Sequence, residues 1–344
     1  MSDEPLRVGI VGAGANTTAR HIPGLQAFDD VQIVGVSNRS RASSERVAQR
    51  FGIPRVYETW QELVAAPDTN AIVIGTWPYL HCRVTLAALA ANKHVLCEAR
   101  MAMNVSEARA MRAAAQARPH LVVQVVPSPV TLRVDATVQR LIADGFLGDI
   151  LAIRVRDGNN FLNAEAELGW RQDADLSGVN MLSLGIWYEA LLRWVGEATR
   201  VMAMGKTFVR MRKDGEGRLR AVRVPEHVDV VADLACGAQA HFGMSSVTGL
   251  AGPSEVSLFG SAGTLRFSGD KLSGGQRDAA ALQEIAIPDD QAGRWRVEEE
   301  FVNAIRGQEA VAHTTFDDGV KYMDFTEAVA RSIMEARAVS LPLS

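Results

Sequence analysis

Residues 8–17 read VGIVGAGANT, a short apolar run that passes into a glycine turn. Gly12 permits a tight turn, and Gly14 lets the backbone approach a pyrophosphate at the amino end of the following helix. Thr17 stands where such turns usually carry a third glycine, so helix and strand must pack around a side chain there. The stretch favours dinucleotide binding, and a plain structural turn is the alternative.

Four further apolar runs follow this turn before residue 127. They are rich in β-branched residues, which predicts strands buried on both faces, at 31–36, 71–76, 94–98 and 121–126. Helical patterns lie between them at 82–91 and 106–117, the second with Ser106 as its N-cap. This alternation predicts a doubly wound parallel sheet, the Rossmann type of α/β fold.

The pattern changes after Pro127. Residues 132–143 predict a helix, and alternating segments from 150 onward predict a mostly antiparallel, open sheet with one face on the core or on a partner. Loops are expected at 210–220 and 269–280, and a last helix at 317–337. We expect a Rossmann domain over 1–126, a substrate and oligomerisation domain over 127–316, and a C-terminal helix and tail over 317–344 that packs back toward the first domain.

Composition narrows the class of protein. The 344 residues carry a net charge of −4 with no long basic run, so no nucleic-acid partner is expected. No apolar run approaches the roughly 20 residues of a membrane span, and no secretory signal is visible. Three cysteines suit a reducing compartment, and the seven histidines lack metal-ligand spacing. We expect a cytoplasmic protein without a metal and without a membrane partner.

The end of the second predicted strand indicates which cofactor is bound. Residues 37–41 read SNRSR and contain no acid, whereas NAD sites usually place a carboxylate there for the ribose hydroxyl. Arg39 and the hydroxyl groups would attract a 2′-phosphate, so NADP is preferred over NAD. The alternative is that Arg39 and Arg41 only form a solvated helix start. The expected contacts are Gly12, Gly14, Ala15, Asn16, Thr17, Asn38, Arg39 and Ser40.

Several longer motifs together resemble one family. They are HIPGL at 21–25, TWPYLH at 76–81, VTLAALAANKHVLCE at 84–98, WRQDADLSG at 170–178, LGIWYEALLRWVG at 184–196 and VSLP at 339–342. In these the chain resembles the Gfo/Idh/MocA family of pyridine-nucleotide oxidoreductases. The resemblance implies a Rossmann domain followed by an α/β domain with a large open sheet. It also implies a homodimer or homotetramer through that sheet, and substrates that are sugars, cyclitols or their derivatives.

The resemblance also implies site residues. By position, the residues that would line the cofactor are Thr76, Trp77, His81 and Glu98, joined by the pair Trp170 and Arg171. His81 is expected to orient the cofactor, and a core position is the alternative for Trp170.

Two departures from the family pattern bear on mechanism. The E-K-P motif reads Glu98–Ala99–Arg100 here, and no lysine occurs between Lys93 and Lys206. A cis bond before Arg100 would cost about 2.5–4 kcal/mol without the proline, so a different loop geometry is expected. The second-domain aspartate and histidine correspond to Ser183 and Trp187, and an indole cannot relay a proton.

A replacement acid–base group is therefore expected in an enzyme. Tyr188 is the first candidate, with Arg100 supplying positive charge or polarising a carbonyl. Glu189 has suitable chemistry, although it can instead pair with Arg193 four residues on. His21 could also reach the crevice. The expected substrate contacts are Asn180, Ser183 and Trp187.

Three functions remain open on the sequence. The first is an NADP(H)-dependent oxidoreductase for a sugar, polyol or related carbonyl or imine compound, with a rearranged acid–base set. The second is a redox-neutral, nicotinamide-dependent lyase, hydrolase or epimerase acting on a sugar derivative. The third is a catalytically silent nucleotide-binding protein.

Overall fold

The computed structural model describes residues 5–344, which form two compact units. The first unit runs to Pro127 and includes Arg296–Val320; the second comprises Ser128–Trp295 and Lys321–Ser344. The first boundary lies one residue from the expected one. Residues 296–316, expected in the second domain, belong to the first unit, and the tail from Lys321 belongs to the second unit.

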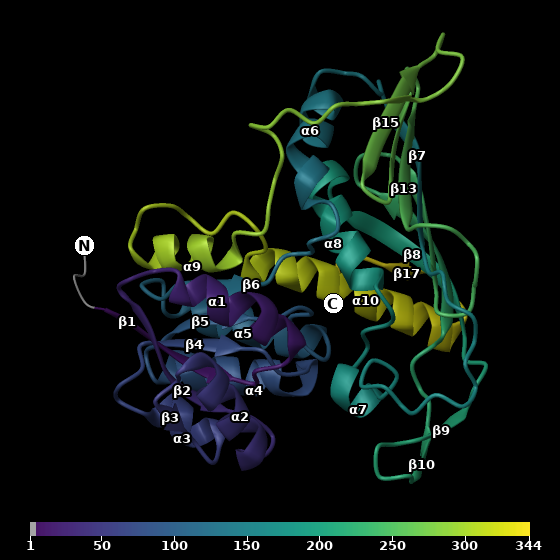
Figure 1. Ribbon diagram of the computed structural model, residues 1–344. Helices are drawn as coiled ribbons and strands as arrows, with labels where there is room; N and C mark the ends of the chain where they lie inside the picture. Colours follow the sequence, from purple (N-terminus) through teal and green to yellow (C-terminus); the bar gives the residue numbers. More distant parts are fainter. Residues whose placement is uncertain (1–4) are drawn as a thin grey trace. The chain divides into compact units, whose positions relative to one another are not determined.

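The first unit is built on a six-stranded parallel sheet (Figure 1). Its strands are β1 (Leu6–Val11), β2 (Val31–Ser37), β3 (Arg55–Val56), β4 (Ala71–Ile74), β5 (His94–Cys97) and β6 (Val123–Val125). Their order, β3-β2-β1-β4-β5-β6, is that of a doubly wound dinucleotide-binding domain, so the predicted fold class is confirmed. Every residue of β4 is buried, as a strand covered on both faces requires.

Helices connect these strands. They are a π-helical turn η1 (Thr17–His21) continued by α1 (Ile22–Gln26), then α2 (Arg41–Phe51), α3 (Trp60–Ala65), α4 (Pro78–Ala90) and α5 (Val105–Gln116). The expected cap of α5 at Ser106 is wrong. Asn104 is the N-cap, because its side-chain oxygen accepts the Glu107 N–H at 2.9 Å.

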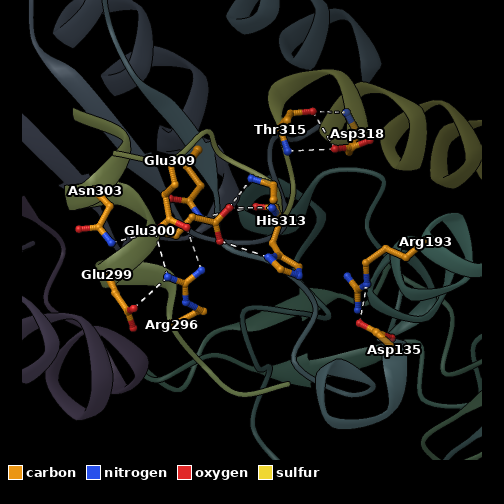
Figure 2. A network of polar contacts seen from close by, with 12 residues as sticks. Asp135, Arg193, Arg296, Glu299, Glu300, Asn303, Glu309, His313, Thr315 and Asp318 are labelled. Carbon is orange, nitrogen blue, oxygen red and sulfur yellow. Dashed lines mark hydrogen bonds and ion pairs between the residues drawn. The ribbon is translucent and has the colours of Figure 1, made fainter. Parts of the chain in front are cut away.

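A later segment of the chain completes the first unit, beginning with α9 (Val297–Ile305). Buried Glu300 on α9 accepts hydrogen bonds from the backbone N–H groups of Ala312 and His313, and Arg296 pairs with Glu299 and Glu309 (Figure 2). These contacts fix the chain after α9. Its Thr314 carbonyl then accepts the Val125 N–H at 3.0 Å and so covers the free edge of β6.

The second unit contains a nine-stranded sheet in the order β16-β15-β14-β13-β7-β12-β11-β8-β17. The strands are β7 (Ile150–Asp157), β8 (Ala198–Lys206), β11 (His227–Leu234), β12 (Gln239–Ser245), β13 (Glu255–Gly260), β14 (Gly263–Ser268), β15 (Lys271–Gln276), β16 (Gln283–Glu284) and β17 (Val339–Ser340). Only the β7–β12 pair is parallel among them. β17 explains why the tail belongs to this unit, because Val339 pairs with Val201 of β8.

Two expected loops are wrong. Residues 210–220 contain most of the hairpin of β9 (Met211–Lys213) and β10 (Leu219–Ala221), and residues 269–280 contain β15. β9 and β15 carry mainly polar or glycine residues, and β9 and β10 are only three residues long each, so all three lack the apolar alternation by which strands are found in a sequence.

Helices cover one face of the nine-stranded sheet. In Figure 1, α6 (Leu132–Ala143), α8 (Leu184–Val195) and α10 (Phe316–Glu335) lie on the same side of it, and the short α7 (Ala174–Ser177) precedes α8. Val228 and Val230 of β11 are buried on the covered face, whereas Val231 points to the other face and is exposed. No helix within residues 5–344 is both long and apolar enough to cross a bilayer.

Candidate cofactor and active site

A pocket of about 570 Å³ lies within the first unit, where β1, β2 and β4 end. In a parallel doubly wound sheet, ligands bind outside the carboxyl ends of the strands, and this volume is typical of a small-molecule site. The predicted cofactor residues that line it are Gly12, Gly14, Asn38, Arg39, Ser40, Thr76 and Trp77.

The glycine turn is closely packed against the end of β4. Gly12 has a φ of +84°, and a Cβ at this position would lie 2.5 Å from Cγ2 of Thr76. Thr17 occupies the place of the usual third glycine, and a Cβ on Gly75 would lie only 2.0 Å from its Oγ1. The strand therefore accommodates Thr17 because Gly75 carries no side chain. At Gly14 a Cβ would make only an ordinary van der Waals contact, 3.5 Å from the Gly75 carbonyl oxygen.

Asn38 connects this turn to the start of α2. Its Oδ1 accepts the Ala13 N–H at 2.6 Å, and its Nδ2 donates to Ser43 Oγ at 3.1 Å. Its own N–H donates to Ser44 Oγ at 2.8 Å. The Asn38 side chain thus fixes the position of the glycine turn relative to the start of α2.

The amino end of α2 gives the pocket its charge. Ser40 is the N-cap of α2, and the first turn of that helix contains no acid. Arg39 and Arg46 line the pocket, and the Arg39 guanidinium lies 5.7 Å from the centroid of the Trp77 ring. A helix N-terminus with two arginines is suited to an anion. Arg41 instead pairs with Glu45 and Glu58, so the solvated interpretation holds for that residue.

These features fit a dinucleotide. Gly14 lies in the pocket wall at the amino end of the first helix, where a pyrophosphate can approach the backbone, and the α2 end can receive a further phosphate. Pocket residues that the sequence analysis missed include Ser43, Arg46, Trp60, Tyr79 and Leu80. The carboxylate of Glu58 also lines the pocket, and it is paired with Arg41. The spacing of Ser43 and Arg46 along α2 from Ser40 was a usable signal, whereas Trp60 is brought in by the fold.

His81 lies behind the pocket rather than in its wall. It is fully buried, with Nδ1 2.9 Å from the Arg100 carbonyl oxygen and Nε2 3.0 Å from the Thr76 carbonyl oxygen. Burial lowers the pKa of His81 despite these hydrogen bonds. The imidazole thus links the loop after β4 to the loop after β5, which is an orienting position.

The loop after β5 departs from expectation. A cis peptide bond joins Ala99 to Arg100, so the expected change of loop geometry is wrong. The contact of the Arg100 carbonyl with His81 anchors the loop, and the Arg100 side chain is buried. Lys93 lies at the other end of β5, where its Nζ donates to the Ala66 carbonyl at 2.6 Å, and it supplies no cation here.

Glu98 takes part in a cluster of three titratable side chains. Nε2 of His21 lies 3.0 Å from Glu98 Oε1, and Nδ1 of His21 is hydrogen-bonded to Oε1 of Glu298 on α9. Asn16 also donates to Glu98 Oε1. Burial alone would lower the pKa of His21, but the hydrogen bonds and charges of Glu298 and Glu98 outweigh it and raise that pKa to about 9. The sequence analysis missed Glu298, which lies 277 residues from His21.

Tyr188 is a core residue of the second unit, so its predicted catalytic role is wrong. Its ring stacks on Phe325 with centroids 3.7 Å apart, and its hydroxyl oxygen accepts the Ala198 N–H at 2.8 Å. The side chain is 2% exposed, and burial raises the pKa of its hydroxyl. A phenol in this setting has neither access to substrate nor a tendency to ionise.

Glu189 is likewise held inside the second unit, so its catalytic candidacy is wrong. Its carboxylate pairs with Arg193, as the spacing of four predicted, and accepts the Ser128 N–H. Arg193 also reaches Asp135 at 2.8 Å (Figure 2). This network fastens α8 to the start of α6 and leaves Glu189 buried.

The other predicted site residues of the second unit do not gather at one site, and each makes contacts within the protein. Trp170 is half-buried beneath the Arg171 guanidinium, 4.2 Å from the ring centroid. Asn180 donates to the Ser177 carbonyl at 2.6 Å, and Ser183 is hydrogen-bonded to Asp157. Trp187 is buried.

The two remaining predicted cofactor residues, Ala15 and Asn16, belong to the first unit and are exposed at the start of its first helix.

Two family profiles match the chain. One, described as an oxidoreductase family with an NAD-binding Rossmann fold, covers residues 6–126, and the other, the GFO/IDH/MocA C-terminal domain, covers residues 136–266. The chain belongs to the Gfo/Idh/MocA family. The resemblance predicted from the sequence motifs is thereby confirmed for both parts of this family member.

A curated relative within the family is trans-1,2-dihydrobenzene-1,2-diol dehydrogenase of Oryctolagus cuniculus. It is 31% identical over 180 residues, which are 52% of this chain and 53% of the relative. The match therefore spans about half the length of this curated relative.

Two solved structures share the fold. The oxidoreductase domain protein of Kribbella flavida has a TM-score of 0.85 at 22% identity, covering 98% of this chain and 99% of that one. Levoglucosan dehydrogenase in complex with NADH has a TM-score of 0.84 at 21% identity, covering 98% and 100%.

Proposed function

We propose that the protein is an NADP(H)-dependent oxidoreductase that acts on a sugar, polyol or related carbonyl compound. One observation carries the cofactor choice: the amino end of α2, which has no acid in its first turn, presents Arg39, Ser40 and Arg46 to the pocket. A 2′-phosphate carries negative charge and acceptor oxygens, which such a surface binds and a carboxylate would repel.

The residues divide the work of holding the cofactor. The glycine turn and the amino end of the helix that follows it form the pyrophosphate site, and Asn38 keeps that turn aligned with α2 by accepting the Ala13 N–H. Thr76 and Trp77 form the wall after β4. When bound, the nicotinamide group supplies the hydride acceptor or donor of the reaction.

The substrate class is inferred from the family. The name of a curated relative refers to a dihydrobenzene diol and that of a structure with the same fold to levoglucosan, and both compounds carry carbinol groups. The acid–base set must differ from the family pattern, because Ala99 and Trp187 provide no proton carrier at the positions of the lysine and histidine.

The absence of the family's lysine and histidine also favours a second candidate, a nucleotide-binding protein without net redox turnover. With Tyr188 and Glu189 engaged in core contacts, neither supplies the missing proton carrier. One measurement distinguishes the two candidates, namely the absorbance of NADPH in the presence of a sugar or carbonyl substrate. An oxidoreductase oxidises NADPH, so the absorbance falls, whereas a redox-neutral or silent protein leaves it unchanged.

We also propose that the protein self-associates through the uncovered face of the nine-stranded sheet. Met202, Met204 and Val231 are exposed on neighbouring strands of that face. Apolar side chains gathered on the open side of a large sheet are typical of an interface between protein subunits.

The cofactor proposal is tested by calorimetric titration with NADPH and NADH. The wild type is expected to bind NADPH more tightly. Arg39→Ala should weaken NADPH binding about 10- to 100-fold, because it removes a charged hydrogen-bond donor, and should leave NADH binding nearly unchanged. Arg50→Ala is the matched control, since Arg50 lies on the same helix but stacks on Phe51 outside the pocket. Tighter binding of NADH by the wild type would contradict the preference.

A further inference from the structure

The cluster of Glu98, His21 and Glu298 joins three distant parts of the first unit. His21 lies in η1, Glu98 directly follows β5, and Glu298 lies in the first turn of α9. His21 is fully buried, and Glu298 is 4% exposed. Buried ionisable groups are costly unless they are paired, so this arrangement calls for an explanation beyond packing.

The geometry defines the protonation of His21. Each ring nitrogen faces a carboxylate oxygen, at 3.0 Å from Nε2 to Glu98 and in a hydrogen bond from Nδ1 to Glu298. An ionised carboxylate only accepts hydrogen bonds, so both nitrogens must carry a proton. His21 is therefore an imidazolium between two acidic side chains.

The close packing of α1 against α9 allows Glu298 to contact His21. A Cβ on Gly24 of α1 would lie 2.9 Å from both Cγ and Oε2 of Glu298. Only glycine at position 24 lets α9 approach closely enough for Glu298 to reach His21. The contact is thus built by two helices that are remote in sequence.

The carboxylate of Glu98 is held from several sides. Its Oε1 accepts from His21 and Asn16, and its Oε2 accepts the Ala99 N–H at 3.0 Å. Burial would raise the pKa of Glu98, but the hydrogen bond and charge of His21 outweigh that effect and lower it. The side chain retains 14% exposure at the carboxyl edge of the sheet, beside the helix that begins at the glycine turn.

Building on the proposed function, we infer that Glu298 and His21 are positioning residues that keep Glu98 ionised and fixed at the carboxyl end of β5, next to β4, whose following residues Thr76 and Trp77 line the pocket. A nicotinamide that extends from the pocket toward this end of β5 meets the carboxylate, whose charge then favours the oxidised cofactor over the reduced one. The oxidised nicotinamide ring is cationic and the reduced ring is neutral. A fixed carboxylate therefore stabilises the bound oxidised cofactor more than the reduced one. The protein can bind the two forms with different affinity only because it interacts differently with each of them.

The first experiment reads the charge of His21 without any cofactor. In ¹⁵N NMR of the histidine-labelled full chain, the wild-type His21 ring should keep imidazolium shifts well above pH 7 and titrate near pH 9. Glu298→Gln should lower that midpoint by more than about one pH unit, because an amide carries no charge. Glu298→Asp should restore part of the shift. Titration of wild-type His21 near its ordinary value would overturn the inference.

The second experiment measures the ratio of NADP⁺ to NADPH affinity by calorimetry at neutral pH. Glu98→Gln should weaken NADP⁺ binding about tenfold and Glu298→Gln about threefold, with little change for NADPH, since each removes one negative charge. Glu299→Gln is the matched control, because this neighbouring side chain pairs with Arg296 instead. NADPH binding and the thermal melting curve show that each variant is folded.

The outcomes separate this inference from the proposed function. If the wild type binds NADPH but Glu98→Gln leaves the affinity ratio unchanged, the inference is wrong and the proposed function stands. If the wild type binds neither cofactor, the proposed function fails and the inference fails with it. A wild-type His21 that titrates high, together with a ratio that falls in both variants, supports the inference.

Discussion

The hydroxyl oxygen of Tyr188 accepts a backbone N–H at the start of β8, and its ring stacks on Phe325 of α10. Residue type suggested proton transfer, but type alone does not reveal whether a side chain faces solvent. The pairing of Glu189 with Arg193 was predictable because residues four apart share one face of a helix. For single residues, spacing along a helix predicted a contact correctly, whereas the burial of a side chain could not be predicted from its residue type.

Replacing the phenol tests this reading of Tyr188. Tyr188→Phe should lower the free energy of unfolding by about 1–3 kcal/mol, because the buried Ala198 N–H loses its acceptor. Cofactor affinity and any turnover should stay at wild-type values. Urea unfolding and an NADPH assay check both effects. A variant of unchanged stability that loses turnover by two orders of magnitude would restore the catalytic assignment.

Among the elements, the buried strands of the first unit were predictable, whereas β9, β10 and β15 of the second unit were not. β1, β2, β4 and β5 are continuous apolar runs because both of their faces are covered. β9, β10 and β15 lack a strong apolar alternation, and the structure identifies them by their backbone pairing. The open face of the large sheet is visible only when registers are known, since Met202 and Val231 become neighbours through pairing.

This open face leads to a prediction on assembly. The wild type is expected to sediment as a dimer or larger species, and Met204→Lys should shift it toward the monomer, because burying an unpaired ammonium group in an interface is unfavourable. Met334→Lys is the matched control, since Met334 is an equally exposed methionine on α10 rather than on the sheet. Sedimentation velocity checks both variants. A monomeric wild type would contradict the proposed interface.

For the whole molecule, the contact of His21 with Glu98 and Glu298 links folding to pH. The folded-state pKa of His21 is about 9 against an ordinary value of 6.5. The charged histidine therefore stabilises the folded state fully below pH 6.5, and this contribution is lost as pH rises through 9. Because the raised pKa depends on α9, this effect is a property of the assembled first unit.

Stability should accordingly fall on the alkaline side. Between about pH 6 and about pH 10 the wild type should lose about 3 kcal/mol of unfolding free energy relative to His21→Gln, which lacks the titrating group. Urea unfolding of both proteins at the two pH values measures the difference. Parallel pH dependence in the two proteins would show that His21 is not charged in the folded state.

The sequence by itself determined the doubly wound unit, the glycine turn, the charged start of α2 and the family. Each of these depends on residues close together in the chain, where periodicity and spacing express the physics directly. Only the tertiary structure decided that Gly75 makes room for Thr17, that Tyr188 is buried, and that Glu298 meets His21. Burial and pairing between distant segments arise when helices and sheets pack, so they follow no local pattern in the sequence.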